Sequence, residues 1–369
     1  MITKKKVLIL TTTDNMIWQF LIPHIRHLQK AGNTVECACA RTGFWFDDLK
    51  DKHGLYVHEI GFTRNPFSFK NIKGYKKLKK LVKATKYDLI HCHQPVGGVM
   101  GRKVGAACKV PVLYVAHGFH FYKGAPLTSK LYKLIETHYA KKTGALVTIN
   151  DEDFQAAKKM KAKNVYKING IGYDSSKVKD DKFDKDPLRK EIGITEKDFV
   201  VLNVAECNKN KNQEAIINAI SMIDENVKLI MCGTGNLLEY YKHLAHTLGC
   251  EDKVEILGYR TDVPNILKLA DAFIMASLRE GLPVSVMEAM SNGLPIIASN
   301  IRGNRDLVED RANGLLVDLN EPDGFLNALK ELSQNKQLCK EMGQQSREKI
   351  QKFSIQEVLK QMEEIYISL

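Results

Sequence analysis

Short apolar runs, many of them β-branched, recur along the chain and leave room for a helix between one run and the next. Apolar strands that alternate with helices are typical of a parallel sheet covered on both faces. The pattern starts again near residue 199, so the sequence predicts an α/β fold with two parallel sheets. The clearest runs are residues 7–10, 89–90, 112–115, 146–149, 200–204, 228–231, 254–257, 272–275 and 295–298.

The most polar stretch of the chain, residues 174–198, lies between the two halves, and Asp and Lys dominate its first part. Such a stretch is typical of a linker, here leading into a short helix near residues 188–192. After residue 354, apolar side chains recur at helical spacing. We therefore expect an N-terminal domain over 1–172, a C-terminal domain over 173–353 and a C-terminal helix over 354–369.

Composition and charge limit the classes of function. The chain has 369 residues, 44% of them hydrophobic and 27% charged, which is typical of a folded protein with more than one core. Residues 1–180 carry 32 Lys and Arg against 13 Asp and Glu, whereas residues 181–369 carry 23 against 30. The basic half is expected to face an anionic partner. No interleaved aromatic platform or helix-turn-helix pattern accompanies this charge, so we expect no nucleic-acid binding.

Two further signals concern location and metals. No apolar run approaches the roughly 20 residues of a membrane span, and the apolar stretch after the basic N-terminus is too short for a signal peptide, so a cytoplasmic protein is expected. The eight cysteines form no C-x-x-C pair and are expected to be buried free thiols. His91 and His93 flank Cys92, but no third ligand lies at suitable spacing, and no metal site is predicted.

Residues 277–290 carry the strongest local signal. A strand runs into a Gly-Pro loop and then into a helix, so the backbone N–H groups of residues 282–285 are placed to bind an anion or sugar hydroxyls. This is the carboxyl edge of a parallel sheet, where ligands bind in such folds. Glu280 precedes the helix and Glu288 lies about one turn inside it. Taken alone, two glutamates at this spacing are more often solvated surface acids.

Further motifs accompany this loop in a fixed order: residues 258–264 before it, and residues 292–299, Gly303 and residues 313–317 after it. Together they closely resemble the retaining GT-B glycosyltransferases, a large family that uses nucleotide sugars. The resemblance covers most of residues 200–330. Within that family the chain looks most like the bacterial transferases of capsular and exopolysaccharide biosynthesis. The cues for this narrower match are residues 64–68, 87–93, 116–119 and 208–212.

The resemblance implies a fold and a division of labour. The fold would be GT-B, with two Rossmann-like parallel-sheet domains facing across a cleft. The N-terminal domain would bind the acceptor and the C-terminal domain the nucleotide sugar. The C-terminal helix would pack back on the N-terminal domain.

The resemblance also implies roles for individual residues. Glu280 and His117 would contact the donor sugar, Glu288 the ribose hydroxyls and Lys211 the diphosphate, with Glu280, Lys211 and His117 as the catalytic residues. An ammonium at Lys211 has independent physical support, because departure of a nucleoside diphosphate builds negative charge that a positioned cation stabilises. The remaining donor-binding residues expected are Gly281, Leu282, Pro283, Val284, Tyr259, Arg260 and Lys209.

The chain departs from the family pattern at two places. Relatives usually have an Arg five residues before the diphosphate-binding Lys, whereas this chain has Glu206, so either Lys209 or Arg260 is expected to supply the second positive charge. Many relatives have a Gly-Gly pair after the first strand, whereas this chain reads Thr11 to Trp18. One interpretation is an acceptor pocket made by Thr13, Asp14, Trp18 and His120, and the other is that Trp18 packs the following helix.

Residues 72–86 contain seven lysines, and Ile72, Tyr75, Leu78 and Val82 form one stripe that is expected to pack on the sheet. Lysines on a solvated face gain about 1 kcal/mol each beside an anionic lipid leaflet. With the nearby Arg64, Phe67 and Phe69, they are candidates for meeting a lipid-linked acceptor. We therefore expect peripheral attachment to the inner face of the cell membrane through Lys76, Lys77, Lys79 and Lys80.

The function expected is retaining transfer of a hexosyl or N-acetylhexosaminyl group from a nucleotide-diphosphate donor, with UDP as the expected carrier. The acceptor would be a lipid-diphosphate-linked saccharide in capsular or exopolysaccharide biosynthesis. No metal or other cofactor is expected. Two alternatives stay open, a nucleotide-sugar 2-epimerase of the same architecture and a non-catalytic partner subunit of another transferase. The sequence does not indicate the oligomeric state.

Overall fold

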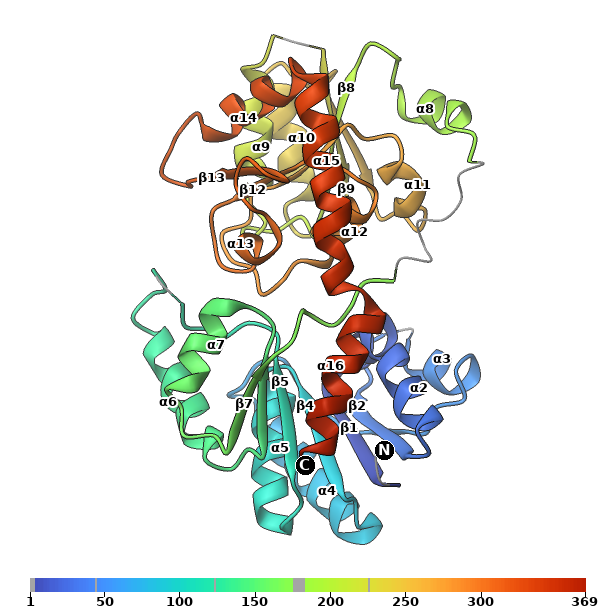
Figure 1. Ribbon diagram of the computed structural model, residues 1–369, viewed down its shortest axis with the longest axis vertical. Coiled ribbons are helices and arrows are strands. Elements are labelled where there is room, and N and C mark those ends of the chain that lie inside the picture. Colours follow the sequence, from blue (N-terminus) through green and yellow to red (C-terminus); the bar gives the residue numbers. More distant parts are fainter. Residues whose placement is uncertain (1–3, 44, 123, 175–182, 225) are drawn as a thin grey trace. The chain divides into compact units, whose positions relative to one another are not determined.

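The structure is a computed structural model that describes residues 4–43, 45–122, 124–174, 183–224 and 226–369 (Figure 1). The chain divides into two compact units. Unit 1 is Met1–Gly172 together with Ile355–Leu369, and unit 2 is Tyr173–Ser354. Residues 175–182 of the expected linker lie outside the described residues, and the short helix expected after it is α8 (Asp186–Ile192).

In its described residues, unit 1 holds a sheet of seven parallel strands in the order β3-β2-β1-β4-β5-β6-β7. The five residues of β5 are all buried, as expected for a parallel strand covered on both faces. The strands are β1 (Lys6–Thr13), β2 (Thr34–Ala40), β3 (Val57–Glu59), β4 (Leu89–His93), β5 (Val112–Ala116), β6 (Ala145–Thr148) and β7 (Asn164–Lys167).

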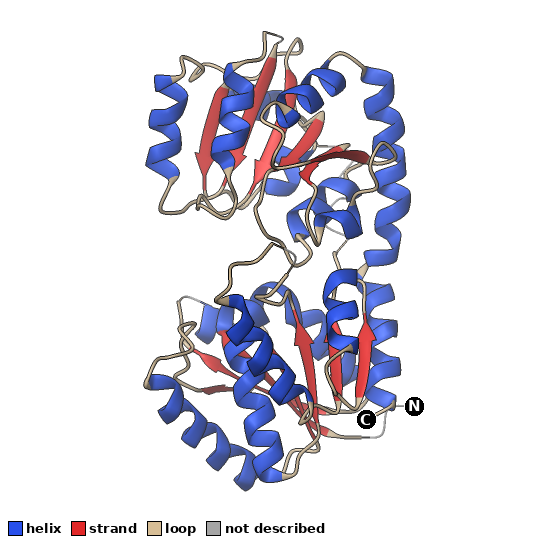
Figure 2. Ribbon diagram, turned by 90° about the vertical axis from the view of Figure 1, so that its left-hand side faces the viewer, coloured by secondary structure: helices blue, strands red, loops and turns tan. Residues whose placement is uncertain are grey.

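Helices cover both faces of this sheet (Figure 2). The C-terminal helix α16 belongs to unit 1, where it contacts α2. The backbone N–H of Asn169 also donates to Gln361 Oε1 of α16 (2.9 Å). The helices are α1 (Asp14–Met16), the π-helix η1 (Ile17–Leu21), α2 (Ile22–Lys30), α3 (Trp45–Asp51), α4 (Lys70–Thr85), α5 (Pro95–Cys108), α6 (Ser129–Ala140), α7 (Asp151–Lys158) and α16 (Ile355–Ile367).

In its described residues, unit 2 holds a sheet of six parallel strands in the order β10-β9-β8-β11-β12-β13. The strands are β8 (Phe199–Val204), β9 (Val227–Cys232), β10 (Val254–Gly258), β11 (Ala272–Met275), β12 (Ile296–Ser299) and β13 (Gly314–Val317). Besides α8, the helices are α9 (Gln213–Ser221), α10 (Leu238–Thr247), α11 (Val263–Leu267), α12 (Val284–Ser291), α13 (Asn304–Leu307), α14 (Gly324–Ser333), α15 (Lys336–Ile350) and the 3-10 turn η3 (Gln351–Phe353).

The two parallel sheets confirm the α/β fold class that the apolar runs predict. One detail of the sequence prediction is wrong. Leu78 and Val82 of α4 are buried, but Ile72 at the start of the same stripe is 53% exposed. Ile72 comes one turn before the part of α4 that packs on the core, so the stripe contributes to the core only from Tyr75 onwards.

Each sheet reverses its strand order at one place. In unit 1 the reversal falls between β1 and β4, which pair directly, and in unit 2 it falls between β8 and β11. Loops that leave two such neighbouring strands on opposite sides open a crevice at the carboxyl edge of the sheet. A ligand-binding site is therefore expected at the carboxyl edge of each sheet, next to its reversal point.

Candidate active site

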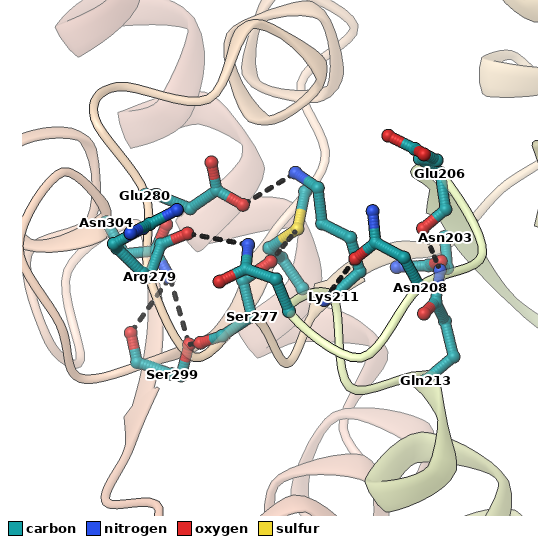
Figure 3. A network of polar contacts seen from close by, with 12 residues as sticks. Asn203, Glu206, Asn208, Lys211, Gln213, Ser277, Arg279, Glu280, Ser299 and Asn304 are labelled. Atoms are coloured by element: carbon teal, nitrogen blue, oxygen red, sulfur yellow. Dashed lines mark hydrogen bonds and ion pairs between the residues drawn. The ribbon is translucent and has the colours of Figure 1, made fainter. Parts of the chain in front are cut away.

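Lys211 and Glu280 meet at the reversal point of unit 2. Lys211 follows β8 and Glu280 follows β11, and Lys211 Nζ donates to Glu280 Oε1 at 2.6 Å. The two side chains point toward each other in Figure 3. They are 21% and 12% exposed, so the pair is partly sheltered but accessible from solvent. Two residues that the resemblance makes catalytic are thus in contact, although 69 positions separate them.

Hydrogen bonds join the loops that carry these two residues. Asn210 Nδ2 donates to the carbonyl of Arg279 (3.0 Å), and the N–H of Leu278 donates to the carbonyl of Asn210 (2.7 Å). Asn212, in the left-handed conformation at the start of α9, donates through Nδ2 to the carbonyl of Ala276 (3.2 Å). The position of Lys211 is therefore set by backbone and amide contacts, independently of its own ion pair.

A third loop packs closely against Ala205–Cys207, the segment that precedes Lys211 in the chain. A Cβ on Gly235 would lie 2.2 Å from the carbonyl oxygen of Cys207, and one on Gly233 would lie 1.9 Å from that of Ala205. The N–H of Cys207 donates to the carbonyl of Thr234 (2.9 Å). The segment Gly233–Gly235 therefore needs glycine because two backbones touch, a role that the sequence analysis missed.

Hydrogen bonds from the end of β12 and the segment after it hold the loop between β11 and α12 in place. Ser299 Oγ donates to the carbonyl of Ser277 (2.6 Å), and Asn304 Nδ2 donates to the carbonyl of Ser299 (2.9 Å) (Figure 3). A Cβ on Gly303 would lie 2.5 Å from the carbonyl oxygen of Gly281. Arg302 is 5% exposed, and its Nε donates to the backbone carbonyl of Glu280 (3.2 Å). Sequence reasoning missed Arg302, whose only signal is its place after a strand at the carboxyl edge.

The helix start expected from the Gly-Pro loop is present. Pro283 is extended and caps α12, which begins at Val284, and Leu282 is buried beside it. The first-turn N–H groups of an α-helix have no intrahelical acceptor, so this end is favourable for an anion. Glu288 lies in α12 and is partly exposed.

The cations proposed to replace the missing Arg differ in their surroundings. The guanidinium of Arg260 donates to both oxygens of Asp262 (2.7 Å each) and to Glu191 (2.7 Å). These hydrogen bonds raise the pKa of Arg260. Two carboxylates therefore already pair with its positive charge. Lys209 is exposed, as is Glu206, which lies apart from the Lys211–Glu280 pair in Figure 3. Of the two expected cations, Arg260 is thus already paired with two carboxylates.

Tyr259 follows β10 and is 68% exposed. Within the described residues, no hydrogen bond or ring contact joins Tyr259 to Lys211 or Glu280. A cavity of about 1140 Å³ opens at the opposite edge of the sheet, where Phe199, Pro295 and neighbouring residues begin β8 and β12. No residue expected to bind the donor lines that cavity, so it is separate from the site.

In unit 1, His117 follows β5 at the carboxyl edge of the sheet. His93 Nδ1 and His117 Nε2 are 2.9 Å apart, one donating and the other accepting. Desolvation, with a smaller contribution from His24, lowers the pKa of His117 to about 4. His117 is therefore neutral at physiological pH, and it can offer a hydrogen bond but not a positive charge.

The residues expected to form an acceptor pocket have structural partners. Asp14 is fully buried and accepts from the N–H of Thr42 (3.1 Å) as well as from the Thr42 hydroxyl. Trp18 stacks on Trp45 with ring centroids 4.7 Å apart, which favours the packing interpretation of Trp18. Thr13 is 2% exposed, and its N–H lies 3.3 Å from Gln94 Oε1.

His120 stacks on Tyr132 with ring centroids 5.0 Å apart and is partly exposed. Among the residues that the structure describes, no group of three or more His, Cys, Asp or Glu side chains is arranged to hold a metal ion. All eight cysteines are free thiols and six are buried as predicted, but Cys108 and Cys339 are partly exposed. No helix in the described part of the chain is long and apolar enough to cross a membrane.

Comparison with known proteins identifies the family. Residues 184–349 match the model of glycosyl transferases group 1, and residues 6–150 match that of glycosyl transferase 4-like proteins. The chain is 33% identical to EpsD of Bacillus subtilis (strain 168), a provisionally named glycosyltransferase, over 98% of this chain and 96% of that protein. It is 34% identical to the Escherichia coli UDP-Gal:alpha-D-GlcNAc-diphosphoundecaprenol alpha-1,3-galactosyltransferase, over 91% and 89%.

Solved structures support the fold. The crystal structure of Anabaena Alr3699/HepE in complex with UDP has a TM-score of 0.83 to this chain at 21% identity, and the match covers 99% and 100% of the two chains. The GT-B fold that the resemblance implies is confirmed. The chain therefore belongs to the group 1 glycosyltransferase family, and the protein is a glycosyltransferase enzyme.

Proposed function

We propose that this glycosyltransferase moves a sugar from a UDP-linked donor to a lipid-diphosphate-linked saccharide, with retention at the anomeric carbon and without a metal, in capsular or exopolysaccharide biosynthesis. The observation that carries the proposal is the contact of Lys211 Nζ with Glu280 at 2.6 Å, at the reversal point of the unit 2 sheet. The names of two similar proteins add support, since one binds UDP and the other uses UDP-Gal and a diphosphoundecaprenol acceptor.

Positive charge for the leaving group would come from the protein itself. Lys211 and the first-turn N–H groups of α12 would hold the diphosphate, and Lys209 would add a second cation. The bond from the anomeric carbon to the diphosphate oxygen breaks, and the acceptor oxygen bonds to that carbon on the same face. The acceptor proton passes to the leaving diphosphate oxygen, so no separate general base is needed. The rate enhancement comes from positioning of the donor and acceptor and from stabilisation of the charge that develops on the leaving diphosphate.

A surface of unit 1 fits the membrane that a lipid-linked acceptor requires. Phe67, Phe69 and Ile72 are 72%, 84% and 53% exposed beside the lysines of α4. We call this group, with Arg64, Lys70, Lys73, Lys76, Lys77, Lys79 and Lys80, the basic apolar surface. Exposed aromatic rings among lysines favour an anionic lipid leaflet, because the rings enter the acyl boundary while the charges meet the headgroups.

A thermal-shift screen tests the donor. UDP, GDP, ADP and a panel of UDP-sugars are added to the full-length protein, with and without EDTA. A ligand at 100 times its Kd stabilises the native state by about 2.7 kcal/mol. We expect UDP and one UDP-sugar to raise the melting temperature equally with and without EDTA. A shift with GDP or ADP alone would reassign the nucleotide, and a shift abolished by EDTA would contradict metal-independent binding.

Substitution of Lys211 tests the site itself. Lys211→Ala is expected to lower kcat about 100- to 1000-fold for the UDP-sugar found in the screen, with a smaller change in KM, because the charge develops in the transition state. Lys190→Ala removes an exposed charge from α8 of the same unit, outside the proposed site, and serves as the comparison. Equal losses in the two variants would contradict the specific role of Lys211.

A further inference from the structure

The cavity of about 1140 Å³ in unit 2 lies at the amino edge of the sheet, away from the candidate active site. Its walls come from the segments that precede β8, β9, β11 and β12, from the turn after α12, and from α8 and α15, which Figure 1 labels. Sites for small molecules are usually about 300–1000 Å³, so the cavity has room for one. No residue assigned to the donor or the acceptor lines it.

The side chains that line the cavity are predominantly cationic. Seven of them are Lys or Arg and three are Asp or Glu, which gives the lining a net charge of +4. The half of the chain that holds the cavity, residues 181–369, carries 23 Lys and Arg against 30 Asp and Glu. Because that half is acidic as a whole, its overall composition does not explain an excess of cations at one cavity.

Most of these cations have no carboxylate partner. Elsewhere in unit 2, Arg311 and Lys349 are ion-paired. Among the lining cations, Lys268 lies over the ring of Phe183, 5.3 Å from its centroid. Within the described residues, the other six form no ion pair with a carboxylate. They are Lys185, Arg189, Lys197, Lys336, Lys340 and Arg347.

Three of the cations, from α8 and α15, act on one carboxylate. Asp271 Oδ2 accepts from the N–H of Val200 at 2.8 Å. Desolvation raises the pKa of Asp271, while the charges of Arg189, Lys336 and Lys185 act in the opposite direction. The two helices thus bring their positive charges to the same part of the cavity. One carboxylate balances at most one of these three charges.

Backbone carbonyls hold the two arginines in place. Arg347 Nη2 donates to the carbonyl of Asn292 (3.0 Å), and Arg189 Nη1 donates to the carbonyl of Thr195 (3.2 Å). A Cβ on Gly293 would lie 2.1 Å from Arg347 Nε, so the glycine in the turn after α12 makes room for this guanidinium. A carbonyl carries no net charge, and each arginine therefore keeps its full positive charge and further N–H donors.

We propose that this cavity is a second binding site, for a small anion with two or more linked phosphate groups. Such a ligand carries several negative charges in one compact group, which matches a lining of cations held without carboxylate partners. Arginine forks bind phosphate oxygens in pairs, and lysines supply point charges. The buried residues Phe199, Leu267 and Leu294 give the cavity apolar walls, which strengthen the field of the cations.

Calorimetry measures this binding directly. Inorganic tripolyphosphate is titrated into the full-length protein at 0.1 M salt, with and without saturating UDP, and into the Lys211→Ala variant. We expect one tripolyphosphate to bind in the presence of UDP and to bind equally well to Lys211→Ala. The affinity should fall as salt is added, because much of the lining is exposed. The proposal is overturned if tripolyphosphate does not bind, or if UDP or Lys211→Ala abolishes its binding.

A double variant locates the bound anion. Lys336→Gln combined with Lys340→Gln removes two exposed charges of α15, and we expect tripolyphosphate to bind about tenfold or more weakly. The matched control is Lys242→Gln combined with Arg311→Gln, which removes two exposed charges of unit 2 that do not line the cavity. It is expected to change the affinity less than about twofold. Equal losses in the two double variants would overturn the proposal, because net charge would then explain the binding.

ATP separates the two sources of linked phosphates, an inorganic polyphosphate and a nucleoside polyphosphate. We expect ATP, like tripolyphosphate, to bind in the presence of UDP and to lose affinity in Lys336→Gln with Lys340→Gln. If ATP binds at least tenfold more tightly than tripolyphosphate, the nucleoside contributes, and the partly exposed Phe183 offers its ring for stacking. If ATP binds no more tightly, the cavity recognises the phosphates alone. The site is ruled out if neither compound responds to the double variant.

Discussion

Lys211 has a partner that a diphosphate would displace. Its ammonium lies 2.6 Å from Glu280, and a partly exposed ion pair of this kind is worth about 0.2–1 kcal/mol. Glu280→Gln removes the competing charge, so we expect UDP to bind about two- to fivefold more tightly while turnover falls, as measured by calorimetry and by release of UDP.

The control is Glu331→Gln, which breaks the ion pair with Arg311 (3.0 Å) in the same unit. It is expected to leave UDP affinity unchanged. Weaker UDP binding to Glu280→Gln would mean that Glu280 orders Lys211 for the diphosphate instead of competing with it.

At the residue scale, a motif in the sequence indicates which residue to examine, but the partners of its side chain come from distant positions that no motif reveals. Lys211 and Glu280 came from motifs, and the structure brings them together. Arg260 also looked available in the sequence, but the bidentate contact with Asp262 and the contact with Glu191 occupy its guanidinium. Glu191 lies 69 positions away on α8, so no local pattern reveals that contact. Arg302 was missed for the same reason.

At the element scale, the close packing of two loops gives a sharp test. A Cβ on Gly235 would lie 2.2 Å from the Cys207 carbonyl oxygen, so Gly235→Ala forces the loop after β9 away from the loop that carries Lys211. We expect a loss of about 1–3 kcal/mol in the free energy of unfolding by urea, and weaker UDP binding. Gly61→Ala is the control, because a Cβ there has no neighbour within 4 Å in the described structure. Equal effects of the two changes would contradict the backbone contact.

The basic apolar surface gives a second prediction at the scale of elements. Changing Lys76, Lys77, Lys79 and Lys80 together to Gln is expected to weaken binding to vesicles with 30% anionic lipid by about tenfold or more at 0.1 M salt. At 0.5 M salt the difference should disappear, because exposed charges are screened. Co-sedimentation with vesicles measures both.

The control for that test removes the same charge elsewhere on unit 1. The exposed residues changed to Gln are Lys141, Lys159, Lys161 and Lys163. These changes are expected to have a smaller effect, because the lysines do not lie beside exposed aromatic rings. If both sets weaken binding equally, the net charge of unit 1 accounts for attachment and α4 has no special part.

The elements themselves were the most predictable level of the structure. Every apolar run identified in the sequence lies in or overlaps a strand, because central parallel strands are buried on both faces and must be apolar. The runs did not include the strands β2, β3, β7 and β13. Of these, β3 (Val57–Glu59) is short, lies at an edge and contains His58. The exposure of Ile72 was missed because helical spacing shows which residues share a face but not where along the helix the core ends.

At the scale of the whole molecule, buried histidines make stability depend on pH. His24, His91, His93 and His117 have a lowered pKa in the folded protein, with desolvation as the main cause, whereas an unfolded histidine titrates near 6.5. Below about pH 6.5 the unfolded chain therefore binds protons that the folded chain does not. The stabilising effect of keeping these groups neutral is present above pH 6.5 and is lost as pH falls toward the folded pKa values.

We expect the free energy of unfolding to fall between pH 7 and pH 5 by up to about 1.4 kcal/mol per pH unit for each such histidine. His24→Gln isolates one of them, since a glutamine N–H can reach the carbonyl of Ile171 that His24 Nε2 contacts (2.8 Å) but does not titrate. Its stability should depend less steeply on pH than that of the wild type in urea unfolding. His243→Gln, at an exposed position, should leave the slope unchanged. An equal slope in His24→Gln and the wild type would mean that His24 is already protonated in the folded protein.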